Sequence, residues 1–339
     1  TSNPFSERGI MKAIGVRAGD KTPRLVWHEV GDVSIGPGEV LVAVRASAVN
    51  RADLLQARGQ YPPPPGASDI LGLEISGVVS AMAEDVQGWS TGDRVMALLP
   101  GGGYAERAAV PSGLLMRMPD NWSFSQGAAV PEAWLTAFLN LFIEGQLAAG
   151  ESVLIHAGAS GVGTAAIQMA RAAGAGVFAT AGSPEKLEAC RRFGAALAVD
   201  YQRQDFAVEI KAHSAGRGVD LILDPVGAAY LNRNIEVLAP GGRLVNIGVM
   251  GGRRAEIDLG MVLGRSLRLI GSRLRHRPVS EKIGIIRQFE ERFWPLLTDG
   301  RLTPVIDRVF PITEAGAAHE YVRENRNIGK VILEMPQAG

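Results

Sequence analysis

A glycine-rich turn between a buried strand and a helix constrains the fold of this chain most. It reads Gly158-Ala159-Ser160-Gly161-Val162-Gly163 and separates an apolar run over 152–156, which predicts a strand, from an alanine-rich run over 163–173, which predicts a helix. A dinucleotide fingerprint requires this context, because the free amides of the helix N-terminus then face the pyrophosphate. The turn therefore predicts a dinucleotide-binding parallel sheet.

One member of this turn departs from the usual pattern. Ser160 stands where a second glycine would let the backbone approach the cofactor closely. Its hydroxyl can hydrogen-bond a phosphate or ribose oxygen, or it can cap the helix. Both interpretations stay open.

Strand and helix patterns divide the 339 residues into two parts, each long enough for its own core. Up to about Pro131, short β-rich runs such as 40–49 and 75–81 alternate with turns, whereas strands and helices alternate afterwards, which is typical of a parallel sheet. Further strands are expected over 176–181, 220–224, 243–248 and 267–271, and helices over 132–147, 184–193, 229–238 and 280–297, the last with Ser280 as its N-cap. The tail, with strands over 305–309 and 330–334 around a helix over 314–324, is expected to rejoin the N-terminal domain.

The end of the second strand of this sheet bears on the choice between NAD and NADP. An acidic residue there would bind the ribose hydroxyls and repel a 2′-phosphate, but the strand ends in Gly182-Ser183. A helix starts next, so the Ser183 hydroxyl, the helix N-terminus and the Lys186 ammonium can meet a 2′-phosphate. This pattern favours NADPH, and it is compatible with Ser183 acting as a helix cap.

Composition excludes several classes of function. The 35 basic and 35 acidic residues cancel, so no general attraction to nucleic acid or to an anionic membrane is expected. Cys190 is the only cysteine, which excludes internal disulfides and favours a reducing, cytoplasmic location. No run approaches the roughly 20 apolar residues of a membrane span, and residues 1–10 lack a secretory signal and are expected to be an extension without a function.

Several segments together resemble the zinc-independent quinone oxidoreductase branch of the medium-chain dehydrogenase/reductase superfamily, from Met11 onward. Besides the glycine-rich turn they are Ala48-Val49-Asn50-Arg51-Ala52-Asp53, Gly59-Gln60-Tyr61 with the prolines that follow, Leu71-Gly72-Leu73-Glu74-Ile75-Ser76-Gly77, Val199-Asp200-Tyr201 and Asn327-Ile328-Gly329-Lys330. The resemblance implies an α/β chain with a GroES-like β-rich catalytic domain over 11–133 and 304–339, a Rossmann domain over 134–303, an active site in the cleft between them, and a homodimer.

The motif and the resemblance together assign the site residues. Asn50 is expected beside the nicotinamide ribose, and Lys186 and Tyr201 around the 2′-phosphate. The full set of cofactor contacts is Asn50, Thr136, Gly158, Ser160, Gly161, Val162, Gly163, Gly182, Ser183, Lys186, Tyr201, Val249, Met250, Gly251, Ser272, Arg273, Leu274, Asn327 and Lys330. Asn50, Tyr201 and Lys330 also have ordinary interpretations as a turn former, an edge tyrosine and a surface charge.

No metal site is expected. Zinc-dependent alcohol dehydrogenases of the superfamily carry a histidine before the glutamate of a Gly-x-Glu motif, whereas this chain has Leu73 before Glu74. With one cysteine, Cys190, the chain also cannot supply the paired cysteine ligands of a zinc lobe.

These features predict hydride transfer from NADPH to a quinone, a reaction that leaves an aryloxide which water can protonate. Tyr61, Asn50 and Ser160 are the candidate catalytic residues, and Tyr61 either stacks on the quinone, hydrogen-bonds its oxygen or packs the proline-rich loop. The histidines, His28 and His276 among them, look scattered along the sequence.

Two other functions remain open. Reduction of an enal, enone or enoyl thioester double bond would use the same scaffold but needs a proton donor for carbon, for which Tyr61 is a candidate. An RNA-binding or structural role, as in zeta-crystallins, is the remoter alternative, and the basic run 273–277 is a small patch for it.

Overall fold

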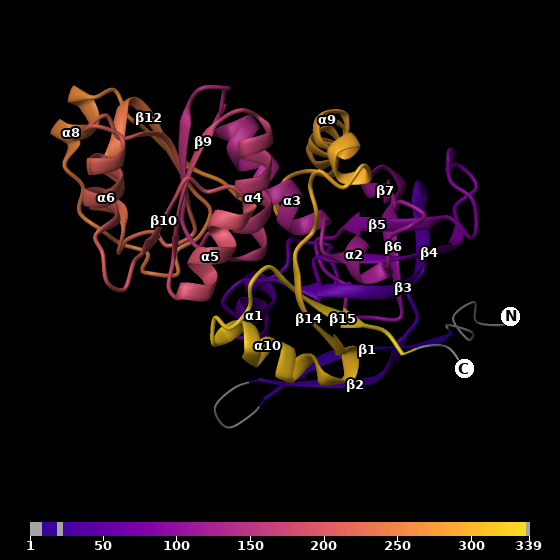
Figure 1. Ribbon diagram of the computed structural model, residues 1–339. Coiled ribbons are helices and arrows are strands. Elements are labelled where there is room, and N and C mark those ends of the chain that lie inside the picture. Colours follow the sequence, from indigo (N-terminus) through magenta and orange to yellow (C-terminus); the bar gives the residue numbers. More distant parts are fainter. Residues whose placement is uncertain (1–8, 19–22, 337–339) are drawn as a thin grey trace, which may run out of the picture. The chain divides into compact units, whose positions relative to one another are not determined.

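The computed structural model describes residues 9–18 and 23–336, which form two compact units (Figure 1). The first unit takes in the described residues up to Glu132, Arg275–Gln288 and those from Ile306 on, and the second takes in Ala133–Leu274 and Phe289–Val305. Residues 1–8, most of the expected extension, lie outside the described part, and Ile10 already opens a strand. No helix of the described part is both long and apolar enough to cross a membrane.

The second unit contains a six-stranded parallel sheet. Its strands are β8 (Ser152–Ile155), β9 (Gly176–Ala181), β10 (Leu197–Asp200), β11 (Val219–Asp224), β12 (Leu238–Asn246) and β13 (Arg268–Gly271), in the order β10-β9-β8-β11-β12-β13. This is the doubly wound order in which the sheet grows outward in both directions from its first strand. The predicted Rossmann sheet is therefore confirmed.

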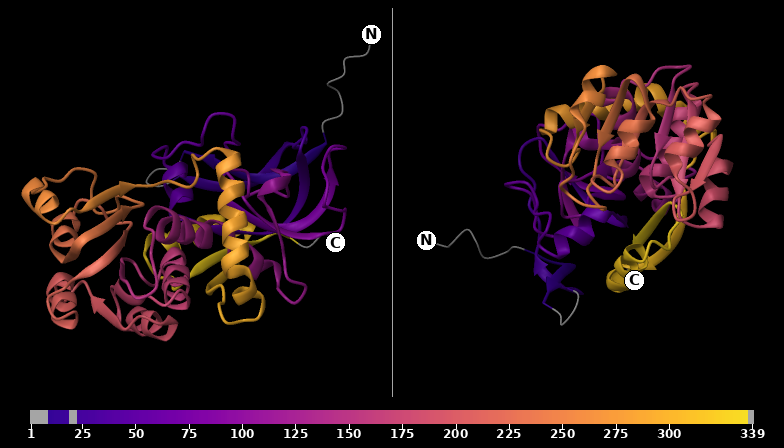
Figure 2. Two further views of the ribbon diagram at one scale, coloured as in Figure 1. Left: turned by 90° about the horizontal axis from the view of Figure 1, so that it is seen from above. Right: turned by 90° about the vertical axis from the view of Figure 1, so that its left-hand side faces the viewer.

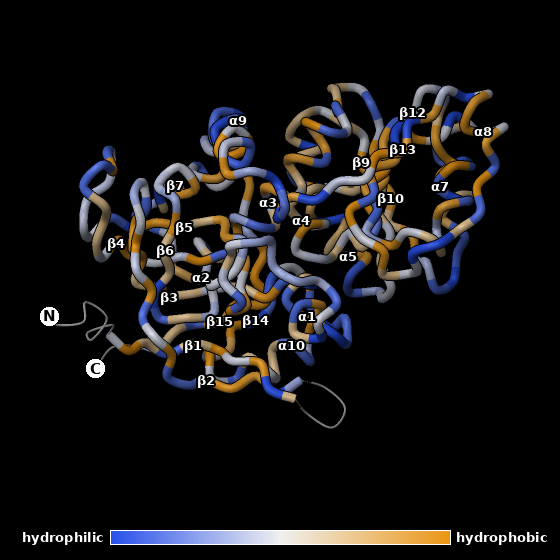
Figure 3. Tube along the Cα trace, turned by 180° about the vertical axis from the view of Figure 1, so that it is seen from behind, coloured by the Kyte–Doolittle hydropathy of each residue, from blue (hydrophilic) through white to orange (hydrophobic). Residues whose placement is uncertain are grey.

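Helices follow the strands of this sheet. They are α4 (Gly161–Ala172), α5 (Pro184–Phe193), α6 (Phe206–His213), α7 (Leu231–Val237) and α8 (Leu259–Gly264). Contacts join α4 and α5 to β9, α6 to β10 and α7 to β12. Apolar colour marks much of β9 and β10 in Figure 3, because strands covered by helices need apolar side chains on both faces. The sequence patterns missed β10, α6 and α8.

Two helices begin or end differently from their prediction. The helix expected over 132–147 is α3 (Pro131–Phe138), and it continues in a wider π-helical turn over Leu139–Glu144. The last helix before the tail is α9 (Val279–Thr298), which Figure 2 shows as one continuous rod despite Pro295. Its predicted cap was wrong, because Ser280 lies inside the helix and the Pro278 carbonyl accepts the first helical hydrogen bond from the Lys282 amide at 3.1 Å.

The first unit is built on a mostly antiparallel sheet. Its strands run in the order β14 (Ile306–Pro311), β15 (Lys330–Glu334), β3 (Glu39–Val49), β4 (Glu74–Met82), β5 (Arg94–Leu98) and β7 (Leu115–Arg117), with β6 (Arg107–Pro111) on β3. A separate hairpin joins β1 (Ile10–Arg17) and β2 (Arg24–Gly31). The helices α1 (Arg51–Ala57), α2 (Phe124–Ala128) and α10 (Ala315–Arg323) also belong to this unit (Figure 1). Because β15 pairs with β3, the prediction that the tail rejoins the N-terminal part is confirmed.

One segment of the first unit comes from a part of the sequence that was assigned to the Rossmann domain. Arg275–Gln288 clusters with the N-terminal and C-terminal segments. The physical reason is Arg275, whose buried guanidinium donates hydrogen bonds to the Pro100 carbonyl at 2.8 Å and to Gln56 Oε1 at 2.6 Å. These bonds join residues more than 170 positions apart, so no local pattern could show them.

Candidate active site

The glycine-rich turn has the geometry of a phosphate-binding turn. A Cβ on Gly158 would lie 2.8 Å from both Ala179 Cβ and Cys190 Sγ, and a Cβ on Gly163 would overlap the Ala157 carbonyl. Both positions therefore require glycine. Ser160 is the N-cap of α4, and its Oγ accepts a hydrogen bond from the Gly163 amide at 3.0 Å. The capping interpretation of Ser160 is thus observed, while its hydroxyl proton can still be donated to a ligand oxygen.

A buried polar network stands directly behind this turn. His156 Nε2 lies 2.7 Å from Asn234 Oδ1, and Asn234 Nδ2 donates to Asp224 Oδ2 at 3.1 Å. Because the Asn234 oxygen must then accept, Nε2 of His156 carries the proton and Nδ1 accepts from the Thr180 hydroxyl at 3.0 Å. Burial lowers the pKa of His156 to about 4, so the ring is neutral at neutral pH. The network ties β8, β9 and β11 together at their carboxyl ends.

The residues predicted around the 2′-phosphate lie together at the end of β9. Ser183 caps α5, and its Oγ accepts from the Lys186 amide at 3.4 Å. A Cβ on Gly182 would lie 2.5 Å from the hydroxyl of Tyr201, which stands at the end of β10 and is 40% exposed. The structure thus brings Gly182, Ser183, Lys186 and Tyr201 to one edge of the sheet.

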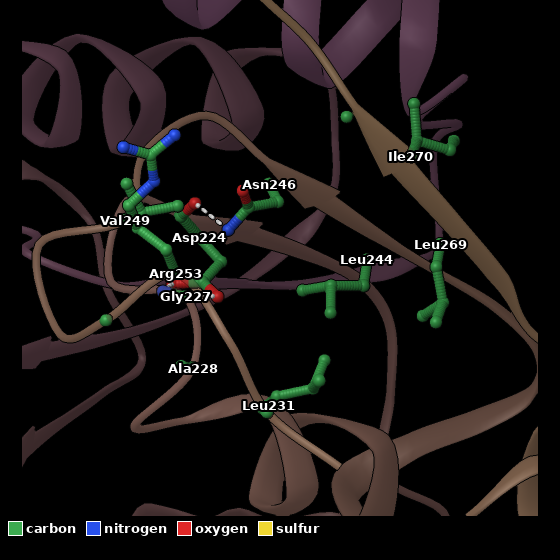
Figure 4. A pocket seen from close by; sticks show the side chains of 13 residues that line it. Asp224, Gly227, Ala228, Leu231, Leu244, Asn246, Val249, Arg253, Leu269 and Ile270 are labelled. Atoms are coloured by element: carbon green, nitrogen blue, oxygen red, sulfur yellow. Dashed lines mark hydrogen bonds between the residues drawn. The ribbon is translucent and has the colours of Figure 1, made fainter. Parts of the chain in front are cut away.

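The carboxyl ends of β11, β12 and β13 surround a cavity of about 240 Å³ (Figure 4). Asp224, Asn246 and Val249 line it, and Asn246 Nδ2 donates to the Asp224 carbonyl at 3.3 Å. Beside it, at the end of β13, the buried Oγ of Ser272 has no hydrogen-bond partner among the described residues. A buried hydroxyl without a partner costs free energy, so Ser272 is suited to a polar ligand group.

The described residues of this unit fit a nicotinamide dinucleotide. A helix N-terminus, two obligatory glycines and the unpartnered Ser272 hydroxyl lie at the carboxyl ends of parallel strands, where such cofactors bind. Among the other predicted contacts, Thr136 belongs to α3, and Met250, Gly251, Arg273 and Leu274 follow β12 or β13.

Three other predicted residues lie in the first unit, and two of them, Lys330 and Asn50, belong to a buried polar cluster with Glu74. Lys330 Nζ lies 2.7 Å from Glu74 Oε1, and the two side chains are 5% and 0% exposed. Asn50 contacts both, since its Nδ2 donates to Glu74 at 2.8 Å and its Oδ1 accepts from Lys330 at 2.7 Å. Asn327 Nδ2 donates to the Gly329 carbonyl at 2.7 Å, just before β15. Lys330 is therefore not the surface charge of the ordinary interpretation.

A second carboxyl group lies close to this ion pair. The backbone amide of Glu132 donates a hydrogen bond to Glu74 Oε2 at 2.8 Å. The side-chain Oε2 of Glu132 has no hydrogen-bond partner among the described residues. Burial, followed by the nearby charge of Glu74, raises the pKa of Glu132 to about 8. The Glu132 carboxyl group is therefore mostly protonated at neutral pH.

Another buried network of the first unit joins Asp53, Tyr104 and His319. The Tyr104 hydroxyl lies 3.1 Å from His319 Nε2 and 3.4 Å from Asp53 Oδ2. Asp53 also accepts the Gly72 amide at 3.0 Å, which holds the turn before β4. Burial raises the pKa of Asp53 to about 6 and lowers that of His319 to about 3.

Tyr61 contacts His276, one of the histidines for which the sequence indicated no role. Its hydroxyl lies 3.2 Å from His276 Nδ1, and the rings meet edge to face with centroids 5.3 Å apart. The Arg275 guanidinium lies over the Tyr61 ring, 5.2 Å from its centroid. The pairing spans 215 positions, so only the tertiary structure reveals it.

The run 273–277 is not a continuous exposed basic patch. Arg275 is 3% exposed, and Arg277 forms an ion pair with Glu281 at 3.2 Å. Salt-dependent attraction to nucleic acid needs several accessible cations, so this run offers little support for RNA binding.

Metal-ligating side chains do not cluster in the described ranges 9–18 and 23–336, where no group of three or more His, Cys, Asp or Glu residues could hold an ion. Leu73 is buried, and the Glu74 carboxylate beside it is bound by Lys330 and Asn50. Burial also raises the pKa of Cys190 to about 12, which keeps this thiol protonated.

Comparison with known proteins agrees with this geometry. The zinc-binding dehydrogenase family matches residues 161–291, and the alcohol dehydrogenase GroES-like domain matches residues 36–120. A mycocerosic acid synthase-like polyketide synthase of Mycobacterium tuberculosis is 35% identical over 332 residues, which cover 96% of this chain. The chain spans only 16% of the length of that relative.

Solved structures resemble the chain over nearly its whole length. The CurK enoyl reductase is 31% identical with a TM-score of 0.84, and the alignment covers 96% of this chain and 99% of the reductase. A quinone oxidoreductase of Pseudomonas syringae is 28% identical with a TM-score of 0.85, at the same two coverages. The chain is an oxidoreductase of the medium-chain dehydrogenase/reductase superfamily, and its motifs place it in the zinc-independent branch.

Proposed function

We propose that the chain is an NADPH-dependent reductase of conjugated, electron-poor carbonyl compounds, with a quinone as the first candidate substrate. The observation that carries this proposal is the buried Lys330–Glu74 pair next to Leu73, where zinc-dependent relatives bind their metal. A simple ketone needs a strong electrophile to stabilise the developing alkoxide, whereas a quinone yields a delocalised aryloxide. The residues present suit the second kind of acceptor.

The side chains at the end of β9 support NADPH as the reductant. When bound, the nicotinamide supplies the hydride, and a quinone then needs one proton from solvent for each aryloxide oxygen that forms. Ser183, the N-terminus of α5 and Lys186 offer donors to a 2′-phosphate, and no carboxylate stands at Gly182 to repel it.

Lys186→Ala tests the choice of cofactor. Loss of a charge-assisted contact worth about 1.5–3 kcal/mol raises KM for NADPH by roughly 10-fold to 100-fold and leaves KM for NADH unchanged. Lys211→Ala is the matched control, since Lys211 lies on α6 and pairs there with Glu236 of α7. An unchanged preference for NADPH in Lys186→Ala refutes the phosphate assignment.

Reduction of an activated carbon–carbon double bond is the second candidate. The Tyr61–His276 pair favours it, because this reaction must protonate a carbon and a phenol backed by an imidazole is a suitable donor. The similarity to an enoyl reductase supports the same candidate.

A substrate panel decides between the candidates. Naphthoquinone, phenanthrenequinone, a cyclic enone and a crotonyl thioester are each assayed with NADPH and with NADH. Turnover of quinones alone supports the first candidate, and stereospecific solvent deuterium in a reduced enone or thioester supports the second. Turnover of none of them with either cofactor refutes the proposed function.

The edge of the Rossmann sheet supports a homodimer. β13 is the last strand of its sheet, and Leu269 on it is 42% exposed. The neighbouring α8 buries none of its residues, Leu259 and Leu263 are 69% and 82% exposed, and Figure 3 shows the helix as an apolar segment. An apolar edge of this kind is suited to pairing with a second copy. Leu263→Glu is expected to convert a dimer into a monomer in sedimentation equilibrium, and an unchanged mass refutes this interface.

A further inference from the structure

We infer that His276 is a positioning and proton-relay residue, which orients the Tyr61 hydroxyl and returns a proton to it each time the reduced substrate has been protonated. This inference rests on the proposed function and extends it to the source of the proton. It concerns two side chains of the first unit that lie 215 positions apart in the sequence.

The geometry of the pair is suited to proton transfer. Tyr61 Oη and His276 Nδ1 are 3.2 Å apart, within hydrogen-bonding range. Tyr61 is half-buried, while His276 is exposed and can exchange protons with water. The pair therefore forms a path from solvent through Nδ1 to the phenol oxygen.

The residue before His276 holds the tyrosine in place. Arg275 is buried, donates to the Tyr61 carbonyl at 3.4 Å and lies over the Tyr61 ring. Its own carbonyl accepts from Lys282 Nζ at 2.7 Å, which anchors this segment to α9. The proline-rich run that follows Tyr61 restricts the loop further, since proline fixes φ. Two consecutive residues thus fix both the ring and the hydroxyl direction of Tyr61.

Hydrogen-bond direction determines which form of His276 supports donation. When Nδ1 carries a proton, it donates to Tyr61 Oη, and the phenol can donate its own proton to the substrate. When Nδ1 is unprotonated, it accepts the phenol proton and withholds it. The imidazolium is the form in which Nδ1 always carries a proton, so proton donation weakens as pH rises through the pKa of His276.

Charged groups stand on both sides of His276. Arg275 and Arg277 are its chain neighbours, Arg275 lies over the Tyr61 ring, and Glu281 on α9 pairs with Arg277. Tyr61 is the titratable group that faces the ring from the proline-rich loop.

Protons and electrons balance in this step. After hydride addition at the β-carbon of an enone, the enolate α-carbon takes the proton from Tyr61 Oη, so one O–H bond breaks and one C–H bond forms. The phenolate then takes the proton from His276 Nδ1, and water returns a proton to the imidazole. Carbon is protonated slowly by water and an aryloxide rapidly, so His276 matters more for enones than for quinones.

Substitution of His276 tests the relay. His276→Gln keeps a hydrogen-bonding group but cannot titrate, and His213→Gln is the matched control because His213 is an exposed histidine of α6. We expect His276→Gln to lower kcat for the enone by roughly 100-fold or more, to flatten the decline of this kcat with rising pH, and to leave KM for the enone unchanged. The control variant is expected to behave as the wild type.

An NMR measurement on the protein without cofactor or substrate complements the kinetics. In protein labelled with ¹⁵N-histidine, the His276 ring nitrogens are followed by NMR from pH 5 to pH 9, in the wild type and in Tyr61→Phe. Loss of the phenol is expected to shift the Nδ1 resonance and the titration midpoint of His276. A titration unchanged by Tyr61→Phe overturns the hydrogen bond on which the relay depends.

The outcomes separate the two proposals. Turnover of neither quinones nor enones by the wild type refutes the proposed function and, with it, the relay. Enone turnover with the same rate and pH profile in His276→Gln overturns the relay and leaves the proposed function standing. Quinone turnover without any enone turnover also overturns proton delivery to carbon through Tyr61.

Discussion

Acid pH should destabilise this protein through His156, the neutral histidine behind the glycine-rich turn. Its ring hydrogen-bonds Thr180 and Asn234 and is 1% exposed. Burial lowers its pKa from 6.5 to about 4. Below pH 6.5 the unfolded chain therefore binds a proton at this position that the folded chain does not bind, so this contribution to stability is complete above pH 6.5 and is lost as pH falls toward 4.

The size of the effect follows from the shift. One pKa unit corresponds to about 1.36 kcal/mol, so a shift of about 2.5 units costs about 2 kcal/mol at pH 5 and about 3 kcal/mol at the acid limit. Other groups, such as His319 with its lowered pKa and Glu132 with its raised pKa, also change stability with pH. A variant that lacks only the His156 imidazole retains those contributions, and they cancel in the comparison.

His156→Gln supplies that comparison, because glutamine does not titrate. Free energies of unfolding are measured by urea denaturation at pH 7.5 and pH 5.0 for both proteins, with wild-type refolding as a check of reversibility. The wild type should lose about 2 kcal/mol more than the variant between the two pH values. An equal loss in both proteins, or a His156 ring that titrates near pH 6.5 by NMR of the folded wild type, refutes the reasoning.

Three further substitutions test other parts of the structure. Lys330→Met leaves the buried Glu74 carboxylate unpaired and should reduce the free energy of unfolding by about 3–5 kcal/mol, and adding Glu74→Gln should restore most of the loss in urea denaturation. Arg275→Met removes three hydrogen bonds around the Tyr61 loop and should increase the hydrogen-exchange rate of that loop, whereas an unchanged rate contradicts the anchoring role. Gly158→Ala places a methyl group against a buried sulfur and should cost about 1–3 kcal/mol and weaken NADPH binding by calorimetry, whereas wild-type affinity contradicts the close packing.

The sequence determined the Rossmann unit of this protein almost completely. Buried parallel strands are continuous apolar runs and their helices begin with strong caps, so β9 over 176–181 and α5 over 184–193 were predicted at their observed bounds. The turn 158–163 and the Gly182-Ser183 end of β9 depend on neighbouring residues, and local patterns report such features well. Three short elements, β10, α6 and α8, escaped because segments of four to eight residues carry little periodicity.

Only the tertiary structure decided which distant side chains meet. Lys330 and Asn50 were predicted as cofactor contacts, and the structure shows that both bind the buried carboxylate of Glu74. His276 looked isolated, and the structure places it on the hydroxyl of Tyr61. Long-range pairs of this kind arise when loops and strands pack, and their free energy depends on desolvation and on partners far away in the chain. The spacing of residues along the sequence does not contain that information, so the binding turn could be predicted while the proton-relay pair could not.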